Sequence, residues 1–259
     1  MADYEFANVT KEGPTLIVEI NRPEKMNALH PPANKELGQI FDDFAADDDL
    51  WVAIITGAGD RAFSAGNDLR YQAEGGEMFP VPSGFGGLTN RYDLKKPVIA
   101  AVNGVAMGGG FEIALACDLI IASDNARFAL PEPKVGLAAL AGGLHRLPRQ
   151  IGLKRAMGMI LTGRHVPADE GKELGFVNAV VPQAELMDEA KRWAGMIGEC
   201  SPMSIRASKE AVMGGLDIAN FEEAFQTRFP AVVDLFKSED FIEGPRAFAE
   251  KRKPEWKGR

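Results

Sequence analysis

Two glutamates occupy unusual positions for a carboxylate. Glu112 follows three consecutive glycines, Gly108 to Gly110, and lies within an apolar run, while Glu132 stands between Pro131 and Pro133. The prolines push residue 132 out of helical conformations and predict a rigid extended turn. A carboxylate is costly to bury unless it is paired or used. Both glutamates are therefore candidates for acid/base chemistry. The alternatives are that the glycines before Glu112 only permit tight helix packing, and that Glu132 is a solvent-exposed acid in a loop.

The glycine turn before Glu112 predicts a site for a negatively charged oxygen. Glycine permits close approach of a ligand, and the first turn of a helix presents unpaired N–H groups at the positive end of its dipole. A second turn, Ala65-Gly66-Asn67, follows another short apolar run. If the two turns face each other, the N–H groups of Asn67 and Gly109 form a two-donor oxyanion hole. Two carboxylates beside it could activate a water and deliver a proton.

Other catalytic arrangements are not favoured. The Ser64 hydroxyl invites a nucleophile interpretation, but the sequence has no Gly-x-Ser-x-Gly elbow. His30, His145 and His165 have neither triad nor metal-ligand spacing and are expected at the surface or in packing contacts. With no cysteine cluster either, we expect no metal.

Composition narrows the class of protein. The chain has 259 residues, 46% of them hydrophobic, which predicts one sizeable globular core. Its 37 acidic and 29 basic residues give a formal net charge of -8, and no basic cluster suggests a nucleic-acid partner. Cys117 and Cys200 lack CxxC spacing and are expected to be thiols in a reducing compartment. Together with an N-terminal stretch unlike a secretory signal, this predicts a cytoplasmic protein. The most apolar stretch, 98–123, is interrupted by polar residues and predicts buried core, not a membrane span.

Alternating units are visible along the chain. Four apolar runs of strand length end in turn residues: TLIVEI, WVAIITG, PVIAAVNG and DLIIASD. Two of them are followed by a short strand, a glycine bend and a helical pattern, which predicts a parallel, coil-like α/β stack. The segment 76–87 lacks periodicity and is expected to be a mobile surface loop. Beyond residue 148 the pattern is mostly helical, with helices expected at 184–199, 203–214, 221–237 and 239–251.

A series of motifs resembles the crotonase, or enoyl-CoA hydratase/isomerase, superfamily over essentially the whole chain. They are NRPEKMNAL, AFSAGNDL, KKPVIAAVNGVAMGGGFEIALACDLIIAS, FALPEPKVGL and AGGLHRLPRQIG, in this order. Within the superfamily, GFGGLT, ALPEPK and the ending EGPRAFAEKRKPEWKGR are similar to the carnitinyl-CoA dehydratase group. The stretch GLAALAGG departs from the family, which often has a proline there; this loop borders the acyl pocket in relatives, so the acyl preference stays open.

The resemblance implies a fold, an assembly and a substrate. The fold is an α/β crotonase (ClpP-like) spiral of ββα units over residues 1–200, followed by a helical C-terminal trimerisation region over 201–259. The assembly is a homotrimer or a dimer of trimers. The substrate is an acyl-CoA thioester, and there is no separate cofactor because coenzyme A is part of the substrate.

The resemblance also implies roles for individual residues. Asn67 and Gly109 are implied as backbone oxyanion donors, and Glu112 and Glu132 as the catalytic carboxylates. Coenzyme A would be held around a larger set, with the last member near the nucleotide and contributed across a subunit boundary: Lys25, Met26, Ala28, Leu29, Ala62, Ser64, Ala65, Gly66, Asp68, Leu69, Gly108 and Lys251.

The presence of both glutamates favours addition or removal of water, because many isomerases of the superfamily keep only one. The main prediction is an enoyl-CoA hydratase. Carnitinyl-CoA dehydratase and double-bond isomerase activities are the alternatives. A non-enzymatic binding protein would be expected to lose the glutamates and is least favoured. Which glutamate is the acid and which the base stays open at this point.

Overall fold

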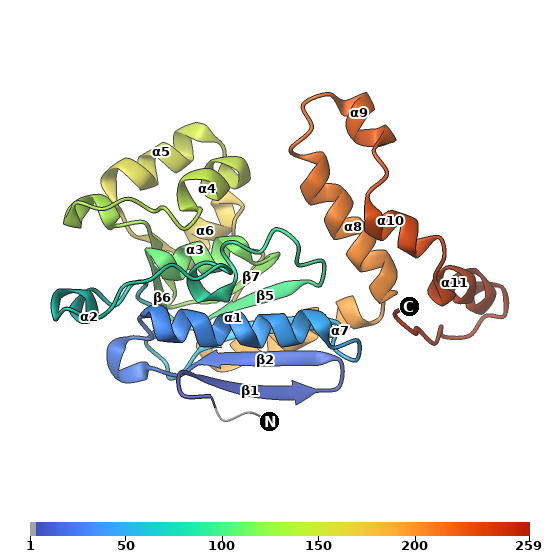
Figure 1. The fold of residues 1–259 in the computed structure, drawn as a ribbon, viewed down its shortest axis with the longest axis horizontal. Helices are drawn as coiled ribbons and strands as arrows, with labels where there is room; N and C mark the ends of the chain where they lie inside the picture. Colours follow the sequence, from blue (N-terminus) through green and yellow to red (C-terminus); the bar gives the residue numbers. More distant parts are fainter. Residues whose placement is uncertain (1–3) are drawn as a thin grey trace.

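Two sheets form the body of the molecule (Figure 1). In the computed structural model, which describes residues 4–259, one sheet has the strand order β1-β2-β3-β5-β7-β10 and the other β4-β6-β8-β9. The strands of the first sheet are β1 (Ala7–Glu12), β2 (Thr15–Ile20), β3 (Val52–Gly57), β5 (Val98–Val102), β7 (Leu119–Ser123) and β10 (Ala179–Val181). Those of the second are β4 (Ala62–Ser64), β6 (Val105–Met107), β8 (Arg127–Ala129) and β9 (Val166–Pro167). Pairing is antiparallel for β1 with β2 and for β8 with β9, and parallel elsewhere.

The chain passes repeatedly from the first sheet to the second. Each of β3, β5 and β7 is followed by a short strand, β4, β6 or β8. The first two units then enter α2 (Leu69–Ala73) and α3 (Gly109–Ala116), and the third enters the 3-10 helix η3 (Glu132–Val135) and α4 (Gly143–Ile151). The α/β spiral of ββα units predicted from the sequence is confirmed, with a third unit that the sequence pattern did not reveal.

Both faces of the first sheet are covered. In β3, Val52 and Ile54 pack in a cluster with side chains of α7 (Leu186–Gly198), whereas Ala53 and Ile55 belong to the larger core shared with α1 (Pro31–Ala46) and α3. This alternation follows from the two-residue period of a strand. A sheet covered on both faces favours continuous apolar runs, such as Val52 to Ile55 in β3.

Shorter helices complete the body. They are η1 (Pro23–Lys25), α5 (Leu153–Thr162), α6 (Ala168–Leu174) and η4 (Gln183–Glu185). The expected surface loop at 76–87 is wrong in its last part, because η2 (Phe85–Gly87) packs against α1 and α3. Gly86 makes this possible, since a β-carbon there would collide with Ile113. No helix within residues 4–259 combines the length and apolarity that crossing a bilayer requires.

The last four helices extend to one side of the sheets. They are α8 (Pro202–Gly215), α9 (Phe221–Gln226), α10 (Pro230–Leu235) and α11 (Glu239–Ala249), and Figure 1 shows them projecting from the body beyond α7. The single helix expected at 221–237 is wrong: the chain is extended at Thr227 and again at Phe229. Pro230 disfavours helical backbone in the residue before it and starts a new helix instead. The helical character of the region is confirmed, while a domain boundary at residue 200 stays a prediction.

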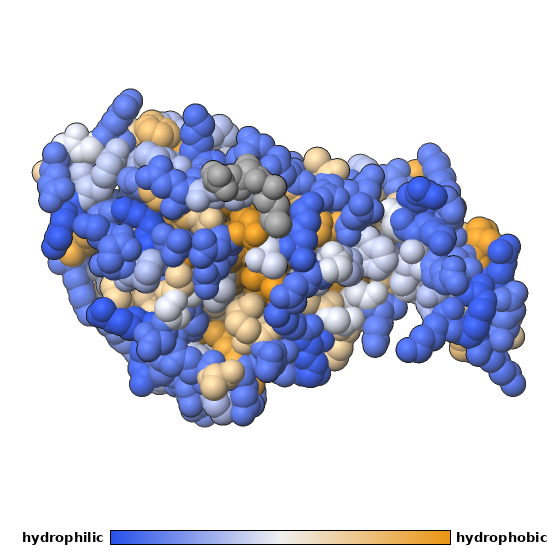
Figure 2. Space-filling model, turned by 90° about the horizontal axis from the view of Figure 1, so that it is seen from below, coloured by the Kyte–Doolittle hydropathy of each residue, from blue (hydrophilic) through white to orange (hydrophobic). Residues whose placement is uncertain are grey.

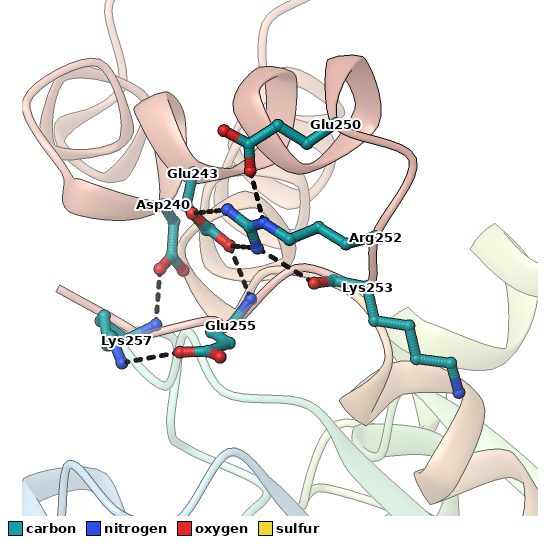
Figure 3. Close-up of polar contacts among 7 residues, drawn as sticks. All are labelled: Asp240, Glu243, Glu250, Arg252, Lys253, Glu255 and Lys257. Carbon is teal, nitrogen blue, oxygen red and sulfur yellow. Dashed lines mark hydrogen bonds and ion pairs between the residues drawn. The ribbon is translucent and has the colours of Figure 1, made fainter.

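The end of the chain is tied back onto α11 (Figure 3). The buried carboxylate of Asp240 accepts hydrogen bonds from the backbone N–H groups of Lys257 (2.7 Å) and Gly258 (3.2 Å) and from the Ser201 hydroxyl (2.8 Å). Arg252 pairs with two nearby glutamates. These contacts join the tail to both α8 and α11.

Candidate active site

Two backbone turns meet at the start of α3. Gly66, with φ of +89°, lies so close to the second turn that a β-carbon on it would be 3.0 Å from the Gly109 nitrogen. Asn67 and Leu29 form a parallel bridge, in which Leu29 bonds to the Gly66 carbonyl and the Asp68 N–H on either side of Asn67. The N–H of Asn67 itself therefore points away from Leu29. Gly109 is the first residue of α3, so its N–H has no partner inside the helix. Among residues 4–259, neither N–H has a hydrogen-bond acceptor, and both are available to a ligand oxygen.

Ser64 holds the first turn in shape. Its buried hydroxyl donates to the Asn27 carbonyl (2.8 Å) and accepts from the Gly66 N–H (3.2 Å). A buried hydroxyl that both donates and accepts a hydrogen bond to the backbone stabilises the conformation of the turn. This placement does not favour a nucleophile at Ser64.

Glu112 lies in the first turn of α3 and is only 3% exposed. Its Oε1 accepts a hydrogen bond from the Gly143 N–H at 2.8 Å. Burial raises the pKa of Glu112 to about 7, against the lowering effect of this N–H, and the nearby Glu132 carboxylate raises the pKa further. A carboxyl group with a pKa near neutrality can both take up and release a proton under ordinary conditions.

Glu132 does not adopt the extended conformation expected from its two prolines. It is the first residue of η3, with Pro131 before the helix and Pro133 in its first turn, where a missing N–H costs nothing. Its Oε2 is buried without a hydrogen-bond partner in the described part of the chain, and burial raises the pKa of this carboxyl group. A β-carbon on Gly108 would lie 2.9 Å from Glu132 Oε1, so the carboxylate extends over the glycine turn.

The structure brings most of the residues expected at coenzyme A together. The Ala65 N–H donates to the Met26 carbonyl (2.9 Å), and the Leu29 N–H donates to the Gly66 carbonyl (2.8 Å). The segments 25–29 and 62–69 therefore run side by side, and the second of them includes the turn at Gly66 and Asn67. Within them are Lys25 at the end of η1, Ala28, the buried Ala62 of β4, and Leu69 at the start of α2, 44% exposed.

Two members of that set are placed differently. Asp68 pairs with Arg22 (3.1 Å) and caps α2 by accepting from the Tyr71 N–H (3.1 Å), so its carboxylate is occupied by structural contacts. Lys251 follows α11, which Figure 1 places at the opposite end of the molecule from α2. Within one chain it is not near the other residues, and its contribution across a subunit boundary stays a prediction.

Sequence reasoning missed two residues that complete the site. Gly143 supplies the N–H that holds Glu112, and the Gly142-Gly143 pair at a helix start repeats the pattern before α3, a signal that could have revealed it. Phe85 lies against the glycine turn at the start of α3, because a β-carbon on Gly109 would be 2.5 Å from its ring. Phe85 belongs to the GFGGLT motif, but this segment lacks periodicity and nothing in it shows that the ring meets Gly109.

The remaining reactive side chains are three histidines and two cysteines. His30 packs edge-on between the rings of Phe6 and Tyr71, and His145 and His165 are exposed, as expected. Both cysteines are free thiols, one buried and one exposed. Within residues 4–259, no three His, Cys, Asp or Glu side chains are grouped to hold a metal ion.

Comparison with known proteins identifies the family of the chain. The family model described as enoyl-CoA hydratase/isomerase matches residues 10–259. Carnitinyl-CoA dehydratase of Escherichia coli (strain K12) is 46% identical over 264 residues, which cover 98% of this chain and 99% of that protein. The crystal structure of an enoyl-CoA hydratase from Mycobacterium tuberculosis H37Rv matches with a TM-score of 0.92 and 38% identity, over 98% of this chain and 99% of that one. That of carnitinyl-CoA hydratase from Mycobacterium avium matches with a TM-score of 0.79 and 38% identity, over 99% and 100% of the two chains. The family model spans nearly the whole chain and the relatives share its fold, so the chain belongs to the enoyl-CoA hydratase/isomerase family.

Proposed function

We propose that this enzyme is an enoyl-CoA hydratase, a hydro-lyase that adds water reversibly across the 2,3 double bond of a 2-enoyl-CoA thioester. The observation that carries the proposal is the pair of carboxylates with raised pKa, Glu112 and Glu132, beside the unpaired N–H groups of Asn67 and Gly109. Coenzyme A enters as part of the substrate, so no separate cofactor is needed.

In the proposed reaction, negative charge develops on the thioester oxygen, toward which the N–H groups of Asn67 and Gly109 would point. Water adds to C3 of the enoyl group, and negative charge moves to the thioester oxygen as an enolate. The N–H groups of Asn67 and Gly109 stabilise this enolate by up to about 3 kcal/mol each. Glu112 takes the proton from the water, and Glu132 donates a proton to C2, which completes the product. Dehydration is the same path in reverse.

A second candidate is the dehydration of carnitinyl-CoA. It is supported by the 46% identity over nearly the whole length to proteins named carnitinyl-CoA dehydratase. The chemistry at C2 and C3 is the same, so the two candidates differ only in the acyl group. Isomerisation of the double bond needs one proton-shuttling carboxylate and is less favoured by a site that has two.

The test is an assay of purified protein on crotonyl-CoA, crotonobetainyl-CoA and a 3-enoyl-CoA, followed by the absorbance of the conjugated enoyl thioester. Loss of absorbance with crotonyl-CoA supports the hydratase, and loss with crotonobetainyl-CoA alone replaces it by the second candidate. A gain of absorbance with the 3-enoyl-CoA, without hydration of either other substrate, contradicts both. The proposal includes a cytoplasmic setting and a homotrimer or a dimer of trimers.

A further inference from the structure

Arg146, in the first turns of α4, has no part in the proposed chemistry, yet its guanidinium lies between two segments of the site. Its Nη2 donates to the Thr89 carbonyl at 2.8 Å, and its Nη1 donates to the Ala141 carbonyl at 3.4 Å. The guanidinium carbon lies 5.8 Å from the centre of the Tyr92 ring. The planar group of arginine suits such a bridge, because its donors point in fixed directions.

On one side, Arg146 reaches the segment that supports the oxyanion turn. The Thr89 hydroxyl accepts from the Phe85 N–H at 2.8 Å, which closes residues 85–89 into a compact loop. The Phe85 ring then occupies the space beside Gly109, where a β-carbon would be 2.5 Å from it. The position of the Thr89 carbonyl is thus linked to that of the Gly109 N–H.

On the other side, Arg146 holds the turn that supports the carboxylate. Gly142 has φ of +106°, and the Arg146 guanidinium fills the place that a β-carbon of Gly142 would take. The next residue, Gly143, donates its N–H to Glu112 Oε1. Ala141, whose carbonyl Arg146 contacts, begins the same turn.

From these contacts we infer that Arg146 is a positioning residue, which fixes the loop 85–89 and the turn 141–143 relative to each other so that the Gly109 N–H and the Glu112 carboxylate face one thioester. The inference rests on the proposed function for the identity of the thioester. Two charged groups act on Glu112: Glu132 on η3 raises its pKa, and Arg146 on α4 lowers it.

The test compares Arg146→Ala and Arg146→Lys with Arg149→Ala as the matched control. Arg149 lies one turn later on the same helix and is exposed, and its one side-chain hydrogen bond within residues 4–259 goes to the His145 carbonyl. The first readout needs no turnover: acetoacetyl-CoA ionises to an enolate that absorbs in the near ultraviolet, so its absorbance on binding reports on the oxyanion turns. The others are kcat and KM for crotonyl-CoA across pH.

We expect Arg146→Ala to lower the bound enolate absorbance and to reduce kcat by about 10- to 100-fold, with KM changed by less than about threefold. The acidic limb of its pH profile should move to higher pH, because a positive charge that favours ionised Glu112 is gone. Arg146→Lys keeps the charge but cannot span two carbonyls, so its limb should stay near that of the wild type while its kcat and enolate absorbance fall. Arg149→Ala should match the wild type.

The two proposals fail in different ways. If the wild type forms the enolate but hydrates no enoyl thioester, the hydratase proposal is wrong and the enolate readout still tests Arg146. If Arg146→Ala keeps the wild-type enolate absorbance and pH limb, Arg146 does not position the site. If Arg146→Ala does not fold, Arg146→Lys decides: wild-type kcat and enolate absorbance in that variant overturn the inference. If the wild type neither forms the enolate nor hydrates, both are wrong.

Discussion

At the scale of single residues, the site places two carboxylates where ionisation is disfavoured. Glu112 is held by one N–H of Gly143, and Glu132 has a buried oxygen without a partner in the described part of the chain. Burial outweighs the hydrogen bond in Glu112, so its pKa rises to about 7. A glutamate in this range can act as a base and be regenerated near neutral pH.

We expect Glu112→Gln and Glu132→Gln each to lower hydration by roughly two to four orders of magnitude, because each removes one proton-transfer partner of the same water and enolate. The double variant should be little worse than the worse single variant, since the two act together. Steady-state kinetics on crotonyl-CoA checks this, with circular dichroism and acyl-CoA binding as controls for folding. A nearly silent single variant would favour the isomerase instead.

Glu112 should also make the protein less stable as pH rises. Its folded pKa of about 7 exceeds the ordinary value of 4.5, so the folded protein binds this proton more tightly than the unfolded chain. The protonated side chain therefore stabilises the fold below about pH 4.5, and that stabilisation is lost between 4.5 and 7. At 1.36 kcal/mol per pH unit, the loss is at most roughly 3 kcal/mol.

Glutamine at 112 has no proton to lose, so Glu112→Gln should escape this decline. Denaturant unfolding at equal protein concentration, from pH 5 to 8, measures it. The stability of the variant relative to the wild type should grow with pH. If the free energy of unfolding of the two proteins depended on pH in the same way, the pKa of Glu112 would be the same in the folded and unfolded chain.

At the scale of elements, the glycines in the turns before and after α2 differ in what their positions require. Gly66 needs both a positive φ and an empty β-position, since a β-carbon would lie 2.6 Å from the Met107 carbonyl oxygen. Gly75 has a similar φ of +84° but nothing within 4 Å of the same position. Alanine variants at Gly66 and Gly75 therefore distinguish the effect of backbone strain, present in both, from the effect of a steric clash, present only at Gly66.

We expect Gly66→Ala to reduce hydration by about 100-fold or more, because the displaced turn moves a donor away from the enolate. Gly75→Ala carries only the backbone penalty of about 1 to 2 kcal/mol and should keep its activity. Kinetics and melting temperatures of both variants provide the comparison. Equal activity in the two would mean that the contact between the turns does not set the oxyanion geometry.

The tail after α11 offers a similar contrast. Asp240→Asn exchanges one acceptor oxygen of a buried group for a donor and should destabilise the protein by about 1 to 3 kcal/mol. Glu250→Gln breaks an exposed pair with Arg252 and should cost less than about 1 kcal/mol. Both residues are visible in Figure 3. Denaturant unfolding that ranks Glu250→Gln as the more damaging change would contradict the importance of the Asp240 contacts.

The sequence predicts what is local and misses what depends on packing. The strands and the glycine turn before Glu112 follow from apolar runs and turn residues close in sequence. Pro230 indicates the break in the helix at Thr227 to Phe229, but the helical spacing of apolar residues on both sides of it predicts one continuous helix. The Gly142-Gly143 pair marks a possible N–H donor, but its partner Glu112 is 31 positions away, and the sequence does not show that the two segments meet.

At the scale of the whole molecule, the C-terminal helices leave large apolar side chains exposed. Phe221, Phe225 and Phe248 are 82 to 86% exposed. In Figure 2 the part of the molecule that projects from the body carries an apolar patch at its far end. Exposed aromatic rings of this size, two of them stacked on α9, favour contacts with further copies of the chain.

We therefore expect a native mass of three or six chains by light scattering at micromolar concentration. Replacing Phe221 and Phe225 by serine should reduce that mass, because their stacked rings on α9 lose apolar area. Met78→Ser, in the loop before η2 and 47% exposed, is the control and should leave it unchanged. A monomeric wild type would contradict the expected assembly.

The groups that we propose to surround the thioester come from three different passages between the two sheets. Asn67 follows β4, Gly109 and Glu112 follow β6, and Glu132 follows β8. A ligand that touches all of them binds only when the three passages are folded together, so its binding energy adds to the cohesion of the whole body. Amide hydrogen exchange should accordingly slow in β4, β6 and β8 alike when an unreactive acyl-CoA is bound, although these strands lie far apart along the chain.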